Sequence, residues 1–497
     1  MTNASVVSRG QLIAALCLAL ALVVGYLLAD PMDSTGLAML VLVVSFLSIP
    51  ILMRWHHPLL IMSWNACVSP FFLPGHPMLW MLLAVVAFFF SVLNRATDSS
   101  RKFLNATPVN WAMALIVLVV VVTAAMTGGV GLQIFGSGHF GGKAYVNIAS
   151  AILGYYAITS RAIPPERATL YVGFFFLSGI TSLMSNLTYV AGPSWYFLFE
   201  FFPPEGALFQ MISDFSPVET VTRFAGAPLA TQAVWSFLLA IFGVEGILNF
   251  SRPWRFVLLL TAFTVGLWGG FRTAVLMFGL VFVILFFIER LWRTRAVFYV
   301  VFGMVTASTV LMLYAERLPL SVQRSVSFLP VRMDAATRLD AESSTEWRVE
   351  MWKKLLPEVP HYFFKGKGYV LNPQDMYLAN ESVLRGFMTS ADVAAEAGDY
   401  HNGPFSVVIP FGIYGAVAFG WFFIAGLWVT WRNFHFGLPE LKRINAFLFA
   451  MFLAKVIFFV VIFGSIHSDL FQFTGLIGLS VALNGGVRKD RPGAAES

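Results

Sequence analysis

The sequence predicts an all-α polytopic membrane protein with about 12–14 transmembrane helices and one large helical loop outside the bilayer. Hydrophobic residues make up 58% and charged residues 12% of the 497 residues, whereas soluble domains carry about 25% charged residues. The mean hydropathy is +0.76. Outside one central segment, almost every stretch is apolar over roughly the 17–25 residues that cross a bilayer core. This composition excludes a soluble globular chain.

Apolar runs of roughly 15–27 residues predict fourteen candidate spans. Two of them, 59–73 and 469–484, are short, and a re-entrant segment is an alternative for each. The first run ends at Asp30 without a small-residue cleavage signature, which favours a helix over a cleaved signal peptide. The spans are 11–29, 35–53, 59–73, 76–93, 109–127, 146–160, 169–191, 229–250, 255–270, 273–288, 296–314, 404–430, 445–463 and 469–484.

Positive charge predicts the orientation of these spans. With a cytoplasmic amino terminus, the inner segments carry about eighteen Lys and Arg residues. The outer segments, apart from the long loop, carry only Lys143, Arg223 and Arg272. The positive-inside rule therefore predicts cytoplasmic termini and a long loop on the outer face of the membrane. The net charge of +6 reflects this orientation and gives no evidence for nucleic-acid binding.

The spans divide the chain into three predicted parts. Residues 1–314 hold eleven spans and the outer loop 192–228, residues 315–403 form a periplasmic loop domain, and residues 404–497 hold three spans and a cytoplasmic tail. The only two cysteines, Cys17 and Cys67, lie in apolar runs, so no disulfide framework is expected. No phosphate-cradling loop motif occurs, so a substrate for chemistry on the outer face must arrive already activated.

The long loop contains one predicted amphipathic helix. Ser343 and Glu346 form a capping box that predicts its start, and Pro357 limits it to about Leu356. An apolar arc covers one side of this helix, and Arg348 falls in its middle. The arc consists of Trp347, Val349, Met351, Trp352, Leu355 and Leu356.

Two arginines and one histidine on the outer face have both a structural and a functional interpretation. Arg348 either forms a salt bridge with Asp334, Asp340 or Glu342, or holds a phosphate or pyrophosphate. Arg272 follows two glycines at the outer end of two spans, and either snorkels to the interface or belongs to the same anion site.

His401 precedes Asn402 at the start of a span. It is either a hydrogen-bonded interface residue or a base that takes a proton from a sugar hydroxyl. Asp399 either orients its ring or caps the following helix.

The order of short motifs resembles the O-antigen ligase and Wzy polymerase superfamily. Ser344-Thr345-Glu346-Trp347-Arg348 is followed by Trp352, then by Gly366-Lys367-Gly368 and His401-Asn402, and Gly412-Ile413-Tyr414-Gly415 lies in the next span. The motifs cover about 75 residues. An outer-face arginine several spans earlier and the layout of many spans with one long loop add to the resemblance.

The resemblance implies a GT-C-like architecture and a metal-independent inverting glycosyltransferase without cofactors in the bacterial cytoplasmic membrane. The donor is then a glycan on undecaprenyl pyrophosphate, and the acceptor is lipid A-core or another glycan. Arg272 and Arg348 are similar to the arginines that hold the pyrophosphate, and His401 is similar to the residue that activates the acceptor. This chain departs from the ligases in its long polar segment 369–400 and in its number of spans.

We assign weaker substrate-binding roles to Asn402, Trp352, Asp399 and Glu200. Glu200 lies in the aromatic loop 192–228, whose rings either stack on sugars or anchor the protein at the lipid interface.

Lys455 is expected to face the bundle interior and to pair with Glu245. His467 and Asp469 lie near the expected site, where a helix cap is a sufficient explanation.

Three functions fit these features. The first is an O-antigen ligase, and the second is a polymerase that uses the same chemistry but elongates a lipid-linked glycan. The third, from another class, is a flippase or transporter of lipid-linked oligosaccharides. A transporter is expected to place its ionisable residues within the spans and to have two related halves, neither of which the sequence shows.

Overall fold

The computed structural model describes residues 34–71, 73, 75–98, 103–131, 141–215, 221–371 and 390–488, with scattered positions between 18 and 26 and between 374 and 382. The chain forms two compact units, residues 1–56 and 57–497. Helix α2 (Ser34–Ser63) begins in the first unit and ends in the second. The description below concerns the second unit. The first predicted span, 11–29, lies almost entirely outside the described residues.

The described residues contain eight helical segments that are long and apolar enough to cross a membrane, which confirms the all-α polytopic fold. Two shorter apolar helices, α10 (Trp254–Leu267) and α11 (Arg272–Ile288), lie among them. Helix α5 (Gly142–Ile158) corresponds to the predicted span 146–160. The eight are α3 (Leu79–Thr97), α4 (Thr107–Thr127), the segment Pro165–Ala191, α9 (Gly226–Ile247), α12 with its 3₁₀ end (Ala296–Arg317), α18 (Gly403–Phe436), η9 with α19 (Pro439–Val461) and α20 (Ile466–Asn484).

The predicted span 59–73 is not a separate helix. Helix α2 ends at Ser63, and the described residues between it and α3 form neither helix nor strand. The Trp64 indole donates a hydrogen bond to the Phe471 carbonyl at 3.0 Å, and the Ser69 amide donates one to the Phe201 carbonyl at 2.8 Å. Irregular backbone at membrane depth is tolerated where protein surrounds it in this way. By contrast, the predicted span 469–484 is the regular helix α20.

The predicted span 169–191 is interrupted in its middle. It consists of α6 (Ala168–Leu177), the 3₁₀ segment η3 (Ser178–Leu183) and α7 (Met184–Ala191). The loop beyond it forms two 3₁₀ turns, η4 (Pro193–Glu200) and η5 (Pro204–Ala207), and the short helix α8 (Leu208–Phe215).

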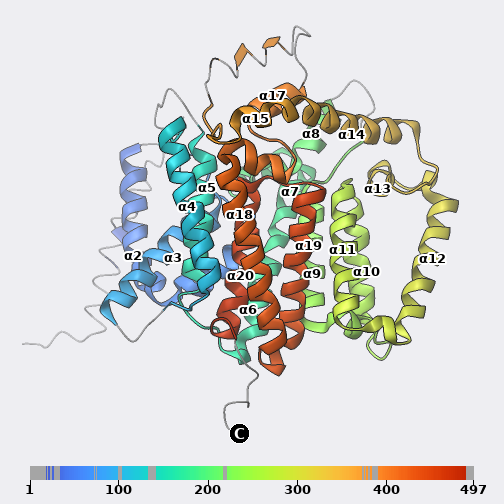
Figure 1. Ribbon diagram of the computed structural model, residues 1–497, viewed down its shortest axis with the longest axis horizontal. Helices are drawn as coiled ribbons and strands as arrows, with labels where there is room; N and C mark the ends of the chain where they lie inside the picture. Colours follow the sequence, from blue (N-terminus) through green and yellow to red (C-terminus); the bar gives the residue numbers. More distant parts are fainter. Residues whose placement is uncertain are drawn as a thin grey trace, which may run out of the picture. The chain divides into compact units, whose positions relative to one another are not determined.

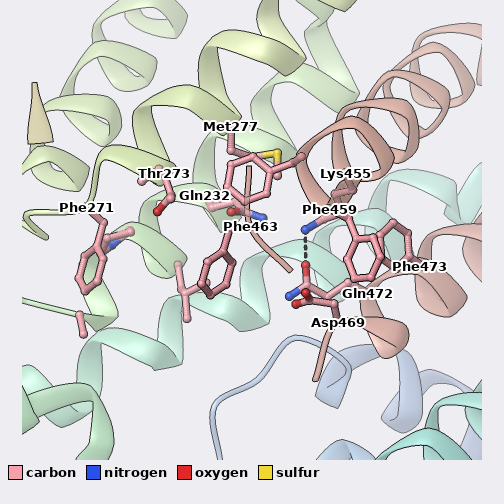
Figure 2. A pocket seen from close by; sticks show the side chains of 15 residues that line it. Gln232, Phe271, Thr273, Met277, Lys455, Phe459, Phe463, Asp469, Gln472 and Phe473 are labelled. Atoms are coloured by element: carbon pink, nitrogen blue, oxygen red, sulfur yellow. Dashed lines mark hydrogen bonds between the residues drawn. The ribbon is translucent and has the colours of Figure 1, made fainter. Parts of the chain in front are cut away.

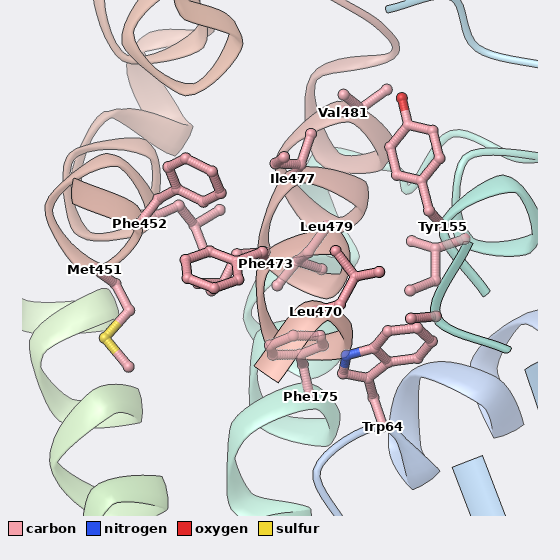
Figure 3. Close-up of a cluster of buried hydrophobic side chains, with 14 of the residues drawn as sticks. Trp64, Tyr155, Phe175, Met451, Phe452, Leu470, Phe473, Ile477, Leu479 and Val481 are labelled. Carbon is pink, nitrogen blue, oxygen red and sulfur yellow. The ribbon is translucent and has the colours of Figure 1, made fainter. Parts of the chain in front are cut away.

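The core of the bundle forms around α20. Figure 3 shows Phe473 and Ile477 of this helix facing Phe452 of α19, while Trp64 and Tyr155 lie on the other side of the helix. These large side chains are all buried. Lipid tails are as apolar as these residues, so close packing contributes most of the attraction between the helices. This core fixes the positions of the helices relative to one another.

Helix α12 (Ala296–Tyr314) differs from the other spans because none of its residues is buried. Figure 1 shows it in yellow at the edge of the bundle. Its upper end leads into the large loop. A helix that is apolar on every side is suited to contact with lipid.

The large loop is helical, as predicted, and lies across the end of the bundle at which α11 begins and α12 ends (Figure 1). We call this end of the second unit the loop end. The described helices of the loop are α13 (Leu320–Ser325), α14 (Ala335–Leu355), the 3₁₀ turn η8 (Leu356–Glu358), α15 (Val359–Tyr362) and α17 (Ser390–Glu396).

Helix α14 begins earlier than the capping box predicts. The helix starts at Ala335, because the Asp334 carboxylate caps it by accepting the Ala336 amide at 2.8 Å. Ser343 lies inside the helix and donates to the Asp340 carbonyl. The prediction placed the start at the nearest capping box and overlooked this cap nine residues upstream. The end of the helix, before Pro357, is confirmed.

The apolar arc of α14 is confirmed in part. Met351 and Leu355 are buried against Tyr400, and Trp347 and Trp352 pack around them. Val349 is exposed although it lies within the helix, and Leu356 is exposed because it lies beyond the end of the helix. This cluster fixes α14 against the segment that leads to α18.

The loop is attached to a bend in α18. Pro410 and Gly412 interrupt this helix, and Gly412 adopts a φ of +63°. The carbonyls of Ile409 and Pro410 accept the amides of Lys367 and Gly368 at 2.8 and 3.0 Å. Gly366 permits the close approach, because a Cβ there would lie 2.3 Å from the Pro410 carbonyl oxygen. These glycines of the motif therefore join the loop to the bundle.

Candidate functional site

Four arginines from separate segments gather at the loop end. Arg223 precedes α9, Arg272 is the first residue of α11, Arg324 lies in α13, and Arg348 lies in α14. Arg272 is within electrostatic range of both Arg324 and Arg348. Tertiary folding therefore concentrates positive charge that the sequence distributes over more than a hundred residues.

A single carboxylate, that of Asp340, binds two of these arginines. Its Oδ1 lies 2.5 Å from Arg223 Nη2, and its Oδ2 accepts a hydrogen bond from Arg324 Nε. Arg324 also donates to the carbonyl of Gly270, two residues before Arg272. The Arg324 side chain is only 4% exposed. It therefore links the start of α11 to α14, the helix that carries Arg348.

Arg272 is held directly against α14. Its Nη2 donates to the Thr345 hydroxyl at 3.1 Å and to the Ala341 carbonyl at 3.3 Å. Its guanidinium lines a cavity of about 480 Å³ together with Arg338 and Glu346. These contacts anchor the side chain to a protein helix, so snorkelling alone does not explain its position.

Arg348 is half-buried and lacks an acidic partner among the residues that the structure describes. Its guanidinium carbon lies 5.7 Å from the centre of the Phe463 ring, a cation–π contact. Burial lowers the pKa of Arg348, and the charge of Arg324 lowers it further. Asp340 is occupied by two other arginines, so it does not supply the predicted salt bridge. A desolvated guanidinium without a carboxylate is suited to an anionic ligand.

His401 lies between Trp347 and Phe463, with its ring centre 5.1 Å from each of theirs. Phe463 therefore contacts both His401 and Arg348. The His401 backbone has a φ of +46°, a conformation that is uncommon for residues other than glycine and is concentrated at functional sites.

The two ring nitrogens of His401 have different surroundings. Nε2 lies 3.5 Å from Asp399 Oδ2, and Nδ1 is buried without a hydrogen-bond partner among the described residues. Burial lowers the pKa of His401 below its usual 6.5; the Asp399 carboxylate opposes this shift and Arg348 adds to it. The ring is consequently neutral at pH 7 and has a lone pair available to accept a proton.

Two of the weaker candidates hold the histidine segment in place. The Trp352 indole donates to the Tyr400 carbonyl at 3.1 Å, and the Asn402 side chain caps α18 by accepting the Phe405 amide at 3.0 Å. The cap of α18 is thus Asn402 rather than Asp399. Glu200 is exposed at the end of η4, and no contact joins it to the arginines or to His401 within the described ranges.

The expected pairing of Lys455 with Glu245 is wrong. Lys455 Nζ instead donates to Gln472 Oε1 across the interior of the bundle. Glu245 lies 3.7 Å from Arg443. The helix-cap interpretation of Asp469 is confirmed, because its carboxylate accepts the Ser465 amide at 2.8 Å.

Sequence analysis missed Arg324 and the role of Arg223 in this site. Arg223 was visible as one of three isolated outer charges, a signal that would have justified grouping it with Arg272. Arg324 gave no comparable signal, because it lies in a short polar helix of a long loop. Asp340 was considered only as a partner of Arg348.

In the described part of the chain, no cluster of three His, Cys, Asp or Glu side chains is arranged to hold a metal ion. No curated protein matches the chain. A family model described as O-antigen ligase matches residues 256–420. The matched region includes Arg272, Arg324, Arg348 and His401. The family and the apolar helices together indicate a multi-pass protein of the bacterial inner membrane. The match to the O-antigen ligase model over residues 256–420 supports the resemblance of this chain to the O-antigen ligase and Wzy polymerase superfamily.

Proposed function

We propose that this protein transfers a glycan from undecaprenyl pyrophosphate to a lipid A-core or similar acceptor on the periplasmic side of the membrane. The observation that carries the proposal is that Arg348 and His401 both contact one aromatic ring, Phe463. An anion site and a neutral base beside each other are what a transfer from a lipid pyrophosphate requires.

In the proposed reaction, His401 removes the proton from the acceptor hydroxyl. The hydroxyl oxygen then bonds to the anomeric carbon of the donor sugar, and the bond from that carbon to the phosphate oxygen breaks. The electron pair leaves with the lipid pyrophosphate, and the proton remains on the imidazole. Attack from the face opposite the leaving group inverts the anomeric configuration.

The neutral ring at pH 7 suits His401 for this role, because a protonated histidine has no lone pair to offer. Asp399 favours the tautomer with hydrogen on Nε2. Nδ1 then carries the lone pair, and its missing hydrogen-bond partner is supplied by the acceptor hydroxyl. The 3.5 Å separation from Asp399 is expected to shorten once substrate is bound.

The arginines stabilise the negative charge that develops on the leaving pyrophosphate. Arg348 and Arg272 are proposed to contact it, since neither forms an ion pair with a described carboxylate. Arg324 and Arg223 are neutralised in part by Asp340, so we assign them the positioning of α11 and α14. Preorganised donors of this kind each contribute about 10²–10³-fold to a rate.

The alternative within the same chemistry is a polymerase that joins repeat units on the lipid carrier. The description of the matching family favours a ligase. Gene deletion followed by gel analysis of surface and lipid-linked glycans separates the two. Accumulation of long lipid-linked chains is expected for a ligase, whereas surface molecules capped with a single repeat indicate a polymerase. Unaltered glycans would contradict both.

A flippase of lipid-linked oligosaccharides, the candidate from another class, predicts a different result. Purified protein in detergent has no two membrane sides, so transport cannot occur there, while glycan transfer can. Formation of a glycan–acceptor product by the purified protein, together with release of lipid pyrophosphate, would exclude a purely transporting role.

A further inference from the structure

A second cavity lies inside the bundle, between α9, α11, α19 and α20 (Figure 2). Its volume is about 250 Å³. Aromatic rings form most of its wall, and polar side chains from all four helices reach it. These polar side chains are Gln232, Thr273, Lys455, Asp469 and Gln472.

The cavity meets the proposed reaction site at Phe463. This ring lines the cavity and contacts both His401 and Arg348. Phe271 and Thr273, which flank Arg272, line the wall contributed by α11. A group held in the cavity therefore lies next to the base and the anion site.

The polar side chains of the cavity are only partly satisfied by one another. Figure 2 shows Lys455 donating to Gln472, with Asp469 beside them. Gln232 and Thr273 form no side-chain hydrogen bond to any residue that the structure describes, although both line the cavity. A bound group with several hydroxyls would supply the missing partners.

The side chains that line the cavity indicate which part of the donor it can bind: the polyprenyl chain, the phosphate or a sugar. A polyprenyl chain is hydrocarbon and would leave Gln232 and Thr273 without hydrogen-bond partners, at a cost of about 1–3 kcal/mol for each buried group. For a phosphate, the attraction of Lys455 would be offset by the repulsion of the Asp469 carboxylate. A sugar ring has apolar faces for the aromatic rings, and its hydroxyls both donate and accept hydrogen bonds.

We propose that this cavity binds the sugar of the donor that is bonded directly to the pyrophosphate. The inference rests on the proposed function and adds the residues that recognise that sugar. The volume is below the roughly 300–1,000 Å³ of sites for drug-sized ligands, so it suits a single ring better than a chain of sugars. Gln232 and Thr273 then select the sugar through its hydroxyls, while the arginines hold the pyrophosphate irrespective of the sugar.

The test compares two ligands, undecaprenyl pyrophosphate with and without its glycan, binding to the purified full-length protein. Gln232→Leu and Thr273→Val remove hydrogen bonds while keeping much of the side-chain volume. We expect each variant to bind the glycan-bearing lipid about tenfold more weakly and to bind the bare lipid pyrophosphate as the wild type does. Thr264→Val, the same change at an exposed position of α10, is expected to alter neither affinity.

Equal weakening for both ligands would assign the cavity to the lipid pyrophosphate and overturn the inference. Unchanged affinity of both variants for both ligands would overturn it as well. If the wild type binds neither ligand, the proposed function fails and not merely the sugar site. Thermal unfolding of the two variants verifies that they are folded; Gln232→Ala and Thr273→Ala, which also remove the polar groups, serve as substitutes if either is not.

Discussion

The arginine group at the loop end and the cavity around Lys455 within the bundle differ in their balance of charge. In the first region, Asp340 pairs with only two of the four arginines. In the second, Lys455 has an amide partner and a carboxylate nearby. A surplus of positive charge prepares a site for an anion, whereas a balanced set of donors and acceptors prepares it for a neutral polar group. The two regions meet at Phe463, beside His401.

His401→Asn removes the proposed base, which lies where the two regions meet. We expect it to reduce glycan transfer more than the other variants do. Loss of a general base lowers rates by about 10²–10⁴-fold. Asparagine tolerates a positive φ, so the melting temperature should be unchanged. Glycan transfer by purified protein and thermal unfolding provide the two measurements. Near-normal transfer would remove His401 from the mechanism.

Arg348→Ala removes one charge from the unbalanced region. We expect transfer to fall about 10²–10³-fold and affinity for bare undecaprenyl pyrophosphate to fall with it. Arg348→Lys is expected to recover only part of this loss, because lysine lacks the planar donor fork. Arg332→Ala changes an exposed arginine of the same loop and is the matched control. If Arg332→Ala and Arg348→Ala had equal effects, the loss of transfer would reflect net positive charge in the loop and not a specific contact of Arg348.

Arg324→Ala separates positioning from ligand contact. Breaking a buried ion pair costs about 3–5 kcal/mol of stability, and the loss of the tie to Gly270 should reduce transfer about tenfold through a misplaced Arg272. The double variant Arg324→Ala with Asp340→Ala should be more stable than expected from the sum of the single changes. Strict additivity in thermal unfolding would show that the pair is not coupled.

The smallest expected effect is a shift in pH dependence. Transfer should decline as pH falls through the His401 pKa, below 6.5, because protonation removes the lone pair. The Asp399 carboxylate raises this pKa, so Asp399→Asn should move the decline to lower pH. Glu396→Gln, which removes a nearby exposed carboxylate paired with Lys367, serves as the control. A shift of the decline to higher pH would contradict the assigned role of Asp399.

Features that depend on the residues of a single span or helix were predictable from the sequence. The all-α membrane fold follows from apolar run lengths, and the buried face of α14 follows from the spacing of Trp347, Met351 and Leu355. The described part of the predicted span 59–73 that follows Ser63 is not helical, and composition does not reveal this because a buried irregular segment is as apolar as a span. Its hydrogen bonds, such as that from Ser69 to Phe201, come from residues far away in the chain.

The site was less predictable because it depends on relations between segments. The sequence singles out Arg272, Arg348 and His401 as isolated polar residues. It does not reveal that Asp340 belongs to Arg223 and Arg324, since these pairs form only when α13 and α14 lie over α11. Lys455 illustrates the same difficulty. Its interior location is predictable from its place in a span, but its partner Gln472 lies on the next helix.

The bend in α18 has a mechanical consequence. Above the bend, the first turns of the helix are hydrogen-bonded to the loop through Lys367 and Gly368, and Asn402 and His401 lie at their start. Below it, the long remainder packs within the bundle. Spans tilt to accommodate a change in bilayer thickness. In α18, this tilt would affect the part below the bend first. The short upper part moves with the loop, so the distance between His401 and Arg348 is insulated from the lipid that surrounds the protein.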